Sequence, residues 1–479
     1  AVGYGSLAAN TTADNNTAVG FCALYTNTTG AQNVAVGAYA LDANTDASQS
    51  VAVGFDALSI STTGTANTAV GFEAARNSTT SSYNTAVGFC SLRSNTTGHN
   101  NTAVGKIALC ANTTGSCNVA IGVEAMDSNT TGGGNVGIGT DSLQGNTEGN
   151  SNVSIGDDTM KTNSTGCYNT AVGTAALCTN STGNGNTAMG MCALAANTTA
   201  ANNTSIGNGS MEANTTGASN VAVGGTALDA NTEGDDNVAV GVAALSAATT
   251  ADDNTAVGHR ALLATTTGAG NTAVGRDSGR RITTGGGNVV VGCCALSYLT
   301  TGTLNTAIGQ AAMICTTGGS NTAIGNGAGY NISTGSCNVV IGRDAGRAGF
   351  SPFGITTEDD RVVIGTDDIT DAYIQVDWTV VSDARDKTNF GTVPHGLDFI
   401  NKLEPISFQF KKSRENDTPH GDVRYGFKAQ DILALEGDNN VIIDTEQPEK
   451  LKYKGEHLVP VLVNAVKELK KEIEELKNK

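Results

Sequence analysis

A five-residue phrase, Asn-Thr-Ala-Val-Gly or a close variant, recurs through most of this 479-residue chain. Its glycine returns with a constant period of 17 at Gly3, Gly20, Gly37 and onward to Gly309. The next step, to Gly325, is one residue shorter, and the step to Gly342 has the original length, so the chain holds 21 copies with a single slip. A short fixed period is typical of one small structural unit stacked on itself, so the sequence predicts a solenoid and not a globule.

Residues 16–32 indicate how one coil is built. The second and fourth residues of a unit, such as Val34 and Val36, share one face of a predicted strand. The small residues between and after them lie on the opposite face. The leucine four residues after the glycine, such as Leu24, is predicted to lie in a second short strand. Asn-Thr-Thr-Gly then makes a turn, in which Asn and Gly tolerate positive φ.

Stacked units bring the same position of each coil into one column. Asn opens 19 of the 20 units that include this position, with Ser50 as the exception. An in-register Asn column is expected to hydrogen-bond from coil to coil. The turn Asn is lost from Ala248 onward, and the leucine column gives way to Gly279, Gly329 and Gly346, so the last third of the repeat is a variant of the first.

A coil of this size has little interior. Each coil is expected to bury a Val and a Leu, which is a small apolar core for the backbone that it must order. A thin coil without disulfides or metal is marginal when it stands alone. We therefore expect several chains to associate, most simply as a homotrimer around a shared axis.

Composition narrows the classes of partner. The net charge is −18, and residues 1–381 carry 11 Lys and Arg against 27 Asp and Glu. An acidic surface disfavours nucleic acid and anionic membrane as partners, and the sequence has no apolar run of the length of a membrane span. The 11 cysteines lack metal-ligand spacing, and their odd number argues against complete disulfide pairing. We expect mostly free thiols in a reducing cytoplasm, and neither a metal nor a cofactor.

The repeat, residues 1–348, is followed by a neck over 349–381 that holds a strand-like run from Ala372 to Val381. Residues 382–479 have ordinary composition and predict a small α+β domain. Its last helix, predicted over 458–477, carries an apolar stripe at steps of three and four, typical of a coiled coil: Val459, Leu462, Val466, Leu469, Ile473 and Leu476. The predicted fold is thus mainly β, a trimeric parallel β-solenoid or β-roll followed by this α+β domain.

The start of the chain carries a further expectation. Residue 1 is an alanine inside a repeat unit, and no signal peptide is visible. We therefore expect a natural N-terminal region to be missing from this sequence.

One segment is a candidate for chemistry, Ser382-Asp383-Ala384-Arg385-Asp386-Lys387. A serine hydroxyl becomes a nucleophile when a base takes its proton, and a lysine serves as that base when burial keeps it neutral. Lys387 follows Ser382 by five residues, which is within reach on a bent segment, and Asp383 and Arg385 would fix the loop. The alternative is that these residues only form a polar capping segment.

The repeat pattern Asn-x-Val/Ala-Ile/Val-Gly-x-x-Ala/Ser resembles the head repeats of trimeric autotransporter adhesins of the YadA type. The likeness covers the strand phrase of most copies, although the unit of that family is a few residues shorter. The resemblance implies a left-handed parallel β-roll with three chains packed side by side, and it implies no ligand.

The chain from residue 382 resembles the intramolecular chaperone domain of many phage tail fibres and tailspikes, the self-cleaving peptidase S74 type known from endosialidases. The matching pieces, in the order of that family, are Ser382-Asp383-x-Arg385-x-Lys387-x-Asn389, Leu403-Glu404-Pro405, Tyr425-Gly426-Phe427-x-Ala429-Gln430-Asp431 and Leu458-Val459-Pro460-Val461-Leu462. The resemblance implies that the domain trimerises, sets the register of three chains and is then released by a cut between Val381 and Ser382. Some relatives keep the fold without cutting.

These features predict a structural protein, a trimeric viral fibre or spike at the virion surface that is folded in the host cytoplasm. Its shaft would bind a receptor on the host cell, and its missing N-terminal region would attach it to the particle. The only enzymatic activity with a candidate site is a single self-cleavage by a Ser382–Lys387 pair. The alternatives are a cell-surface adhesin or extracellular filament of the same roll and, more remotely, an ice-binding solenoid in which Thr columns such as Thr28 and Thr29 order water.

Overall fold

The computed structural model describes residues 1–351, 353–369, 373, 382–413, 416–438, 440–446 and 448–478. The chain divides into two compact units, Ala1–Ile364 and Gly365–Lys479. The strand-like run predicted from Ala372 to Val381 lies outside the described residues, apart from Tyr373.

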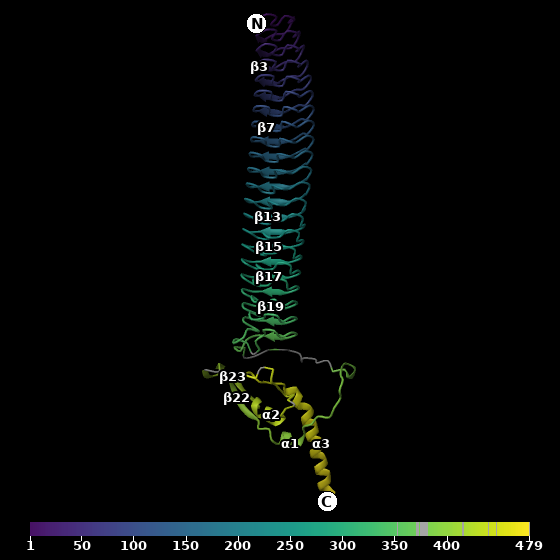
Figure 1. Ribbon diagram of the computed structural model, residues 1–479, viewed down its shortest axis with the longest axis vertical. Coiled ribbons are helices and arrows are strands. Elements are labelled where there is room, and N and C mark those ends of the chain that lie inside the picture. Colours follow the sequence, from purple (N-terminus) through teal and green to yellow (C-terminus); the bar gives the residue numbers. More distant parts are fainter. Residues whose placement is uncertain are drawn as a thin grey trace. The chain divides into compact units, whose positions relative to one another are not determined.

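The first unit is a parallel β-solenoid in which each coil contributes one three-residue strand (Figure 1). The strands are β1 (Thr17–Val19), β2 (Val34–Val36), β3 (Val51–Val53), β4 (Thr68–Val70), β5 (Thr85–Val87), β6 (Thr102–Val104), β7 (Val119–Ile121), β8 (Val136–Ile138), β9 (Val153–Ile155), β10 (Thr170–Val172), β11 (Thr187–Met189), β12 (Thr204–Ile206), β13 (Val221–Val223), β14 (Val238–Val240), β15 (Thr255–Val257), β16 (Thr272–Val274), β17 (Val289–Val291), β18 (Thr306–Ile308), β19 (Thr322–Ile324), β20 (Val339–Ile341) and β21 (Val362–Ile364). Each strand pairs in register with the next, as Ala18 of β1 does with Ala35 of β2. The predicted mainly β fold, a parallel solenoid of 17-residue repeats, is confirmed.

The middle residue of each strand faces the core. Ala18 is fully buried, whereas Thr17 and Val19 on either side of it are exposed. The expectation that each coil buries a Val is therefore wrong. Most coils bury Ala there, and only a few bury Val, such as Val290 and Val340. The interior is narrow where the leucine column keeps a large side chain: Gly137 replaces the core alanine in β8, and a Cβ there would already lie 2.8 Å from Cγ of Met126.

The leucine of each coil is buried, but it lies in a turn. Cys22 and Leu24 have φ angles of 52° and 51°, and the chain forms turns after Gly20. Left-handed φ angles at alternate positions curl the backbone, so the predicted second strand is wrong. Hydrogen bonding between coils continues through this turn, because the Leu24 amide donates to the Ala40 carbonyl at 3.0 Å.

The turn that follows also differs from expectation. Neither Asn27 nor Gly30 has a positive φ, and the left-handed residue is Gln32, with a φ of 62°. Glycine is needed there for space, because a Cβ on Gly30 would collide with the Ala47 carbonyl oxygen of the next coil. Close stacking, and not a left-handed backbone, therefore selects glycine at this position.

Two Asn columns run inside the solenoid. In the column that opens the units, the Asn135 amide donates to Oδ1 of Asn118 at 3.0 Å, and Asn135 Nδ2 donates to the Gly149 carbonyl at 2.8 Å. In the turn column, Nδ2 of Asn129 donates to Oδ1 of Asn112 at 2.8 Å. The predicted hydrogen bonding of Asn from coil to coil is confirmed, and it satisfies buried amide groups that would otherwise be costly.

The turn Asn column and the leucine column both change toward the end of the solenoid. Gly279 stands in the leucine column, while Ile282 replaces the turn Asn and is fully buried. A Cβ on Gly279 would lie 2.9 Å from Cδ2 of Leu262 and 3.0 Å from Cδ1 of Ile282. The same exchange recurs at Gly329 and Ile332. In these two coils the isoleucine at the turn position fills the space of the missing leucine, whereas Leu245 and Leu262 are kept where Ala248 and Thr265 replace the turn Asn.

The solenoid continues past the last regular repeat. Residues 349–364, which the sequence places in a neck, belong to the first unit. There β21 pairs with β20 in the common register, with Val362 beside Val339. The one-residue slip leaves the strands untouched, because Thr306 of β18 still pairs with Thr322 of β19 across the shortened step.

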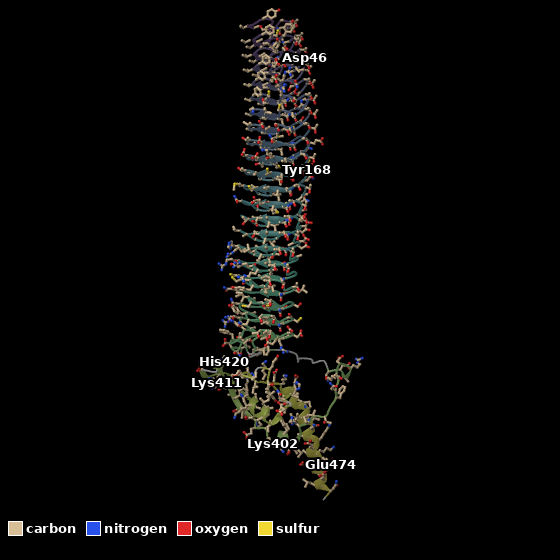
Figure 2. The ribbon with its side chains drawn as sticks, viewed as in Figure 1. Asp46, Tyr168, Lys402, Lys411, His420 and Glu474 are labelled. Atoms are coloured by element: carbon tan, nitrogen blue, oxygen red, sulfur yellow. The ribbon has the colours of Figure 1, made fainter. Side chains whose placement is uncertain are left out.

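The second unit is a small α+β arrangement. Its elements are η1 (Ala384–Asp386), α1 (Leu397–Ile400), β22 (Ile406–Ser413), β23 (Asn416–Gly426), α2 (Ala429–Glu436), β24 (Ile443–Asp444), β25 (Lys452–Tyr453), η2 (Gly455–His457) and α3 (Leu458–Lys477). Strands β22 and β23 form an antiparallel hairpin that carries Lys411 and His420 (Figure 2). The buried core is small and consists of Phe399, Ile432, Ile442, Ile443, Leu458 and Val461.

Asp42 is a half-buried carboxylate whose titration should change stability. Among the described residues none donates a hydrogen bond to its buried Oδ1. Burial, together with the charge of Asp56, raises the pKa of Asp42 to about 6 from its ordinary 3.8. The folded state therefore binds the proton more tightly than the unfolded state, so this contribution is present below about pH 4 and is lost as the pH rises to about 6.

Asp42→Asn is therefore expected to raise the free energy of unfolding at pH 7.5 by about 1–2 kcal/mol and to change it little at pH 4. Chemical denaturation at the two pH values measures the difference. Asp46→Asn is the matched control, because Asp46 is exposed in the same coil (Figure 2). Equal effects of the two substitutions at pH 7.5 would contradict the prediction.

Candidate functional site

Residues 382–387, in the second unit, fold back on themselves. Asp383 caps the 3-10 turn η1, where its side chain accepts a hydrogen bond from the Arg385 amide at 2.9 Å. The turn returns the chain so that Nζ of Lys387 donates to Oγ of Ser382 at 2.5 Å and to the Ser382 carbonyl at 3.3 Å. The two residues predicted as a catalytic pair are thus in direct contact.

The two supporting residues form an ion pair across the same turn. Arg385 Nη2 lies 2.6 Å from Oδ2 of Asp383, and Arg385 Nε donates to both carboxylate oxygens at 3.1 Å. These hydrogen bonds hold the pKa of Asp383 below its ordinary value. The pair bridges the turn that brings Ser382 to Lys387, and a supporting role in cleavage stays a prediction.

The geometry meets one requirement of nucleophilic catalysis, the contact between nucleophile and base. The second requirement is a neutral lysine, which needs a desolvated amine. Ser382 and Lys387 are both exposed in this chain. Val381, whose carbonyl the serine would attack, lies outside the described residues. The catalytic roles of Ser382 and Lys387 therefore stay a prediction.

Helix α3 has two apolar faces. Leu458, Val461 and Ala465 are buried against the rest of the second unit. The predicted coiled-coil stripe lies on the other face and is exposed, with Val466 at 65% and Leu476 at 70%. Charged residues flank the stripe, among them Glu474, which is labelled in Figure 2. Glu474 pairs with Lys470 at 3.9 Å. A stripe of this kind in water is typical of a helix that packs against another helix.

Two polar residues of α3 that the sequence analysis missed attach the preceding segment to the helix. Glu468 Oε2 accepts a hydrogen bond from the Leu397 amide at 2.6 Å, and Asn464 Nδ2 donates to the Val393 carbonyl at 3.1 Å. The contacts join residues about 70 positions apart in the sequence. No local pattern marks such positions, so only the folded structure could identify them.

Glu436 is a further residue that the sequence analysis missed. It is buried at the end of α2, where it accepts hydrogen bonds from the amides of Val441, Ile442 and Ile443 at 2.8, 2.7 and 3.0 Å. The carboxylate thus closes the loop that leads to β24 and supplies three amides with an acceptor.

The outer strand face of the solenoid carries no charge. The two outward residues of each strand from β1 to β20 are Thr, Val, Ile or Met. Their exposure is constant along the column, with Val19, Ile121 and Ile341 each 39% exposed. Because residues 1–381 have far more acidic than basic side chains, this face is where a second chain of the same charge can approach closely.

The threonine columns bear on the ice-binding alternative. Oγ1 of Thr113 donates to the Thr130 carbonyl at 3.1 Å, and Oγ1 of Thr130 donates to the Thr147 carbonyl at 2.9 Å. One of the two columns is therefore engaged in hydrogen bonds between coils. Its hydroxyl protons are not free to order water.

Comparison with known proteins identifies one family. Residues 382–441 match the family model of the chaperone of endosialidase. The matched range begins at Ser382 and includes Lys387 and the first three of the four sequence pieces noted above. No curated protein and no solved structure matches the chain. The front of the second unit is thus similar to this chaperone family, as the sequence predicts.

The described residues contain neither a metal site nor a membrane-spanning helix. Among them, no group of three or more His, Cys, Asp or Glu side chains is placed to hold a metal ion. In the same ranges, none of the helices is both long enough and apolar enough to cross a membrane. The eleven cysteines are free thiols.

Proposed function

We propose that the chain is one subunit of a homotrimeric fibre or spike of the phage tail type. The observation that carries this proposal is a match to the chaperone of endosialidase directly after a long β-solenoid. The solenoid would form the shaft, over residues 1–348 and its continuation. Residues 382–479 would be the domain that drives trimerisation and folding, joined to the shaft by a neck that ends at residue 381.

Two unpartnered surfaces support self-association. The uncharged outer strand face runs along the whole solenoid, and the apolar stripe of α3 is exposed in the second unit. Identical chains would cover the strand face where their solenoids pack together and the apolar stripe where their α3 helices pack together. Each of these contacts between chains would remove apolar side chains from water. The contact on the strand face would bring no like charges together, because that face is uncharged.

The uniform repeat explains why such a shaft would need a separate domain that sets the register of the three chains. Because every coil presents nearly the same face, three shafts could pair one coil out of register with little loss of contact. The second unit does not repeat, so its association would have only one register. Trimerisation that begins at α3 would therefore align the three chains before the coils stack.

The biological role that fits this architecture is attachment to a host cell. The shaft would contact the receptor, a preceding N-terminal region would join the fibre to the virion, and assembly would take place in the host cytoplasm. The chaperone match favours this role over an adhesin or filament, because the solenoid alone would fit either class.

Self-cleavage would follow trimerisation. A neighbouring chain would bury Lys387 and keep its amine neutral. Ser382 Oγ would then attack the Val381 carbonyl carbon while Lys387 Nζ takes the hydroxyl proton. The peptide C–N bond breaks, and Lys387 returns the proton to the Ser382 nitrogen. Water hydrolyses the resulting ester to a Val381 carboxylate and a free serine hydroxyl.

The test is the denatured mass of the full chain beside Ser382→Ala and Lys387→Ala variants. We expect a fragment that begins at Ser382 from the parent and only uncut chain from both variants, because each lacks one member of the pair that is 2.5 Å apart. Lys387→Arg is the control that keeps the positive charge but cannot act as a base, and it should also remain uncut.

Native mass of the same samples tests the oligomer separately. Uncut variants that are still trimers would show that assembly does not require cleavage. An uncut parent trimer would contradict self-cleavage and leave the fibre proposal standing. A parent that stays monomeric would contradict the proposed function itself.

A further inference from the structure

An exposed column of aromatic rings runs along the first six coils of the solenoid. Its successive members, with their exposures, are Tyr4 (79%), Phe21 (45%), Tyr39 (37%), Phe55 (43%), Phe72 (43%) and Phe89 (50%). Neighbouring ring centroids lie 5.5, 5.3, 6.0, 5.4 and 5.3 Å apart. Such a continuous apolar surface on a soluble chain is typical of an interaction site.

The column is continuous even where the repeat position fails. Five of its rings directly follow the repeat glycine of a coil, but Ala38 occupies that position in the third coil. The next residue, Tyr39, supplies the ring instead and bridges Phe21 and Phe55. After Phe89 the same position carries Lys106, and most later coils place polar, charged or small residues there.

The rings adjoin the uncharged strand face. Each ring that follows the glycine lies two residues after the outward-facing third strand residue, as Phe72 does after Val70. The uncharged surface is therefore widest in the first six coils. Flanking carboxylates are neutralised, because Asp56 pairs with Arg76 at 3.2 Å and Glu73 pairs with Arg93 at 2.6 Å.

We propose that the ring column is an interchain clasp, covered by the other copies of this chain in the trimer. This inference rests on the homotrimer proposed above. A copy of the same net charge can approach here because Asp56 and Glu73 are paired with arginines, and aromatic side chains are enriched where protein surfaces meet. Continuity with the strand face that the trimer would cover makes the second copy the occupant of the rings.

The place of the clasp gives it a role. It lies in the coils farthest along the chain from Ser382, so it remains in the shaft when the second unit is cut away. The second unit aligns three chains during assembly, and the clasp then holds the first six coils of the described shaft together. The trimer would thus be held at the second unit and at the clasp before cleavage, and at the clasp after it.

The test compares Phe72→Glu with Tyr83→Glu in the full chain. Tyr83 lies in the same coil, outside the column, and is 64% exposed. We expect Phe72→Glu to shift trimer dissociation to at least about tenfold higher protein concentration, measured by sedimentation. Tyr83→Glu should leave it unchanged, and circular dichroism should show the same β content for both.

Radical footprinting of the parent protein measures the solvent accessibility of Phe72 and Tyr83 without any substitution. Phe72 should be oxidised more slowly in the trimer than after dilution to monomer, whereas Tyr83 should be oxidised equally in both states. A parent that is never trimeric would overturn the proposed function. If the parent is trimeric but Phe72 stays accessible in the trimer, the clasp is overturned. Equal dissociation of the Phe72→Glu and Tyr83→Glu variants would also overturn it. In either case the rings would be available to a different ligand.

Discussion

Replacing Gly224 by Ala is expected to disrupt the solenoid at that coil, at a cost of at least about 3 kcal/mol. Gly224 has a φ of 140°, which an L side chain rarely adopts, and an added Cβ would lie 2.6 Å from the carbonyl carbon and oxygen of Gly241. Neither backbone can yield, because the Gly224 amide donates to Ile206 and the Gly241 amide to Val223, both at 2.8 Å.

The neighbouring residue supplies the control. Gly225 has no positive φ, and a Cβ on it would meet only the Asn208 carbonyl oxygen, at 3.9 Å. Gly225→Ala is therefore expected to change the free energy of unfolding by less than about 0.5 kcal/mol. Amide hydrogen exchange resolves the effect coil by coil and should place the loss of protection around Gly224. Equal tolerance of both substitutions would contradict the close stacking of these glycines.

Placing charge on the outer stripe of α3 is expected to abolish trimerisation. Leu469 and Ile473 are 45% and 42% exposed and contribute nothing to the buried core of the second unit. Leu469→Glu combined with Ile473→Glu would bring six carboxylates together in a three-helix seam, where desolvation and repulsion oppose association. We expect monomers, or aggregates of shafts whose register was never set.

Lys471→Glu is the matched control, because Lys471 lies on the charged side of α3 and its pair with Glu475, at 3.9 Å, is an exposed one of little energetic value. Native mass measures the oligomer, and circular dichroism reports whether each chain still folds. A double variant that remains trimeric would show that α3 is not the trimerisation seam. Loss of trimers in both variants would instead indicate a general effect of charge.

The sequence determines the stacking of this protein more completely than the path of each coil. A constant period allows only one common register, which the pairing of Thr17 with Val34 displays. The direction of each side chain is less constrained, because alternation in a strand is equally compatible with Val or with Ala inside. The left-handed backbone at Cys22 and Leu24 has no glycine to indicate it.

The candidate site also has contacts that the sequence predicts and contacts that it does not. Ser382 and Lys387 are close enough in sequence for one turn to join them, so their contact could be predicted. The links from Glu468 and Asn464 to residues about 70 positions earlier could not, because they depend on how α3 packs. The aromatic column was within reach of sequence analysis, since its rings recur beside the repeat glycine, but Tyr39 falls one position out of step.

The common register of β1 to β21 also bears on how such a protein can evolve. Successive coils are joined by the same strand pairing and, at almost every step, by a hydrogen bond to the Asn that opens the unit, so a coil that is duplicated or deleted leaves similar joints on both sides. Recombination between near-identical gene segments would therefore lengthen or shorten the shaft in whole coils without redesigning either end. The length of the shaft would then depend only on the number of repeats in the gene. It could differ between close relatives whose binding surfaces are the same.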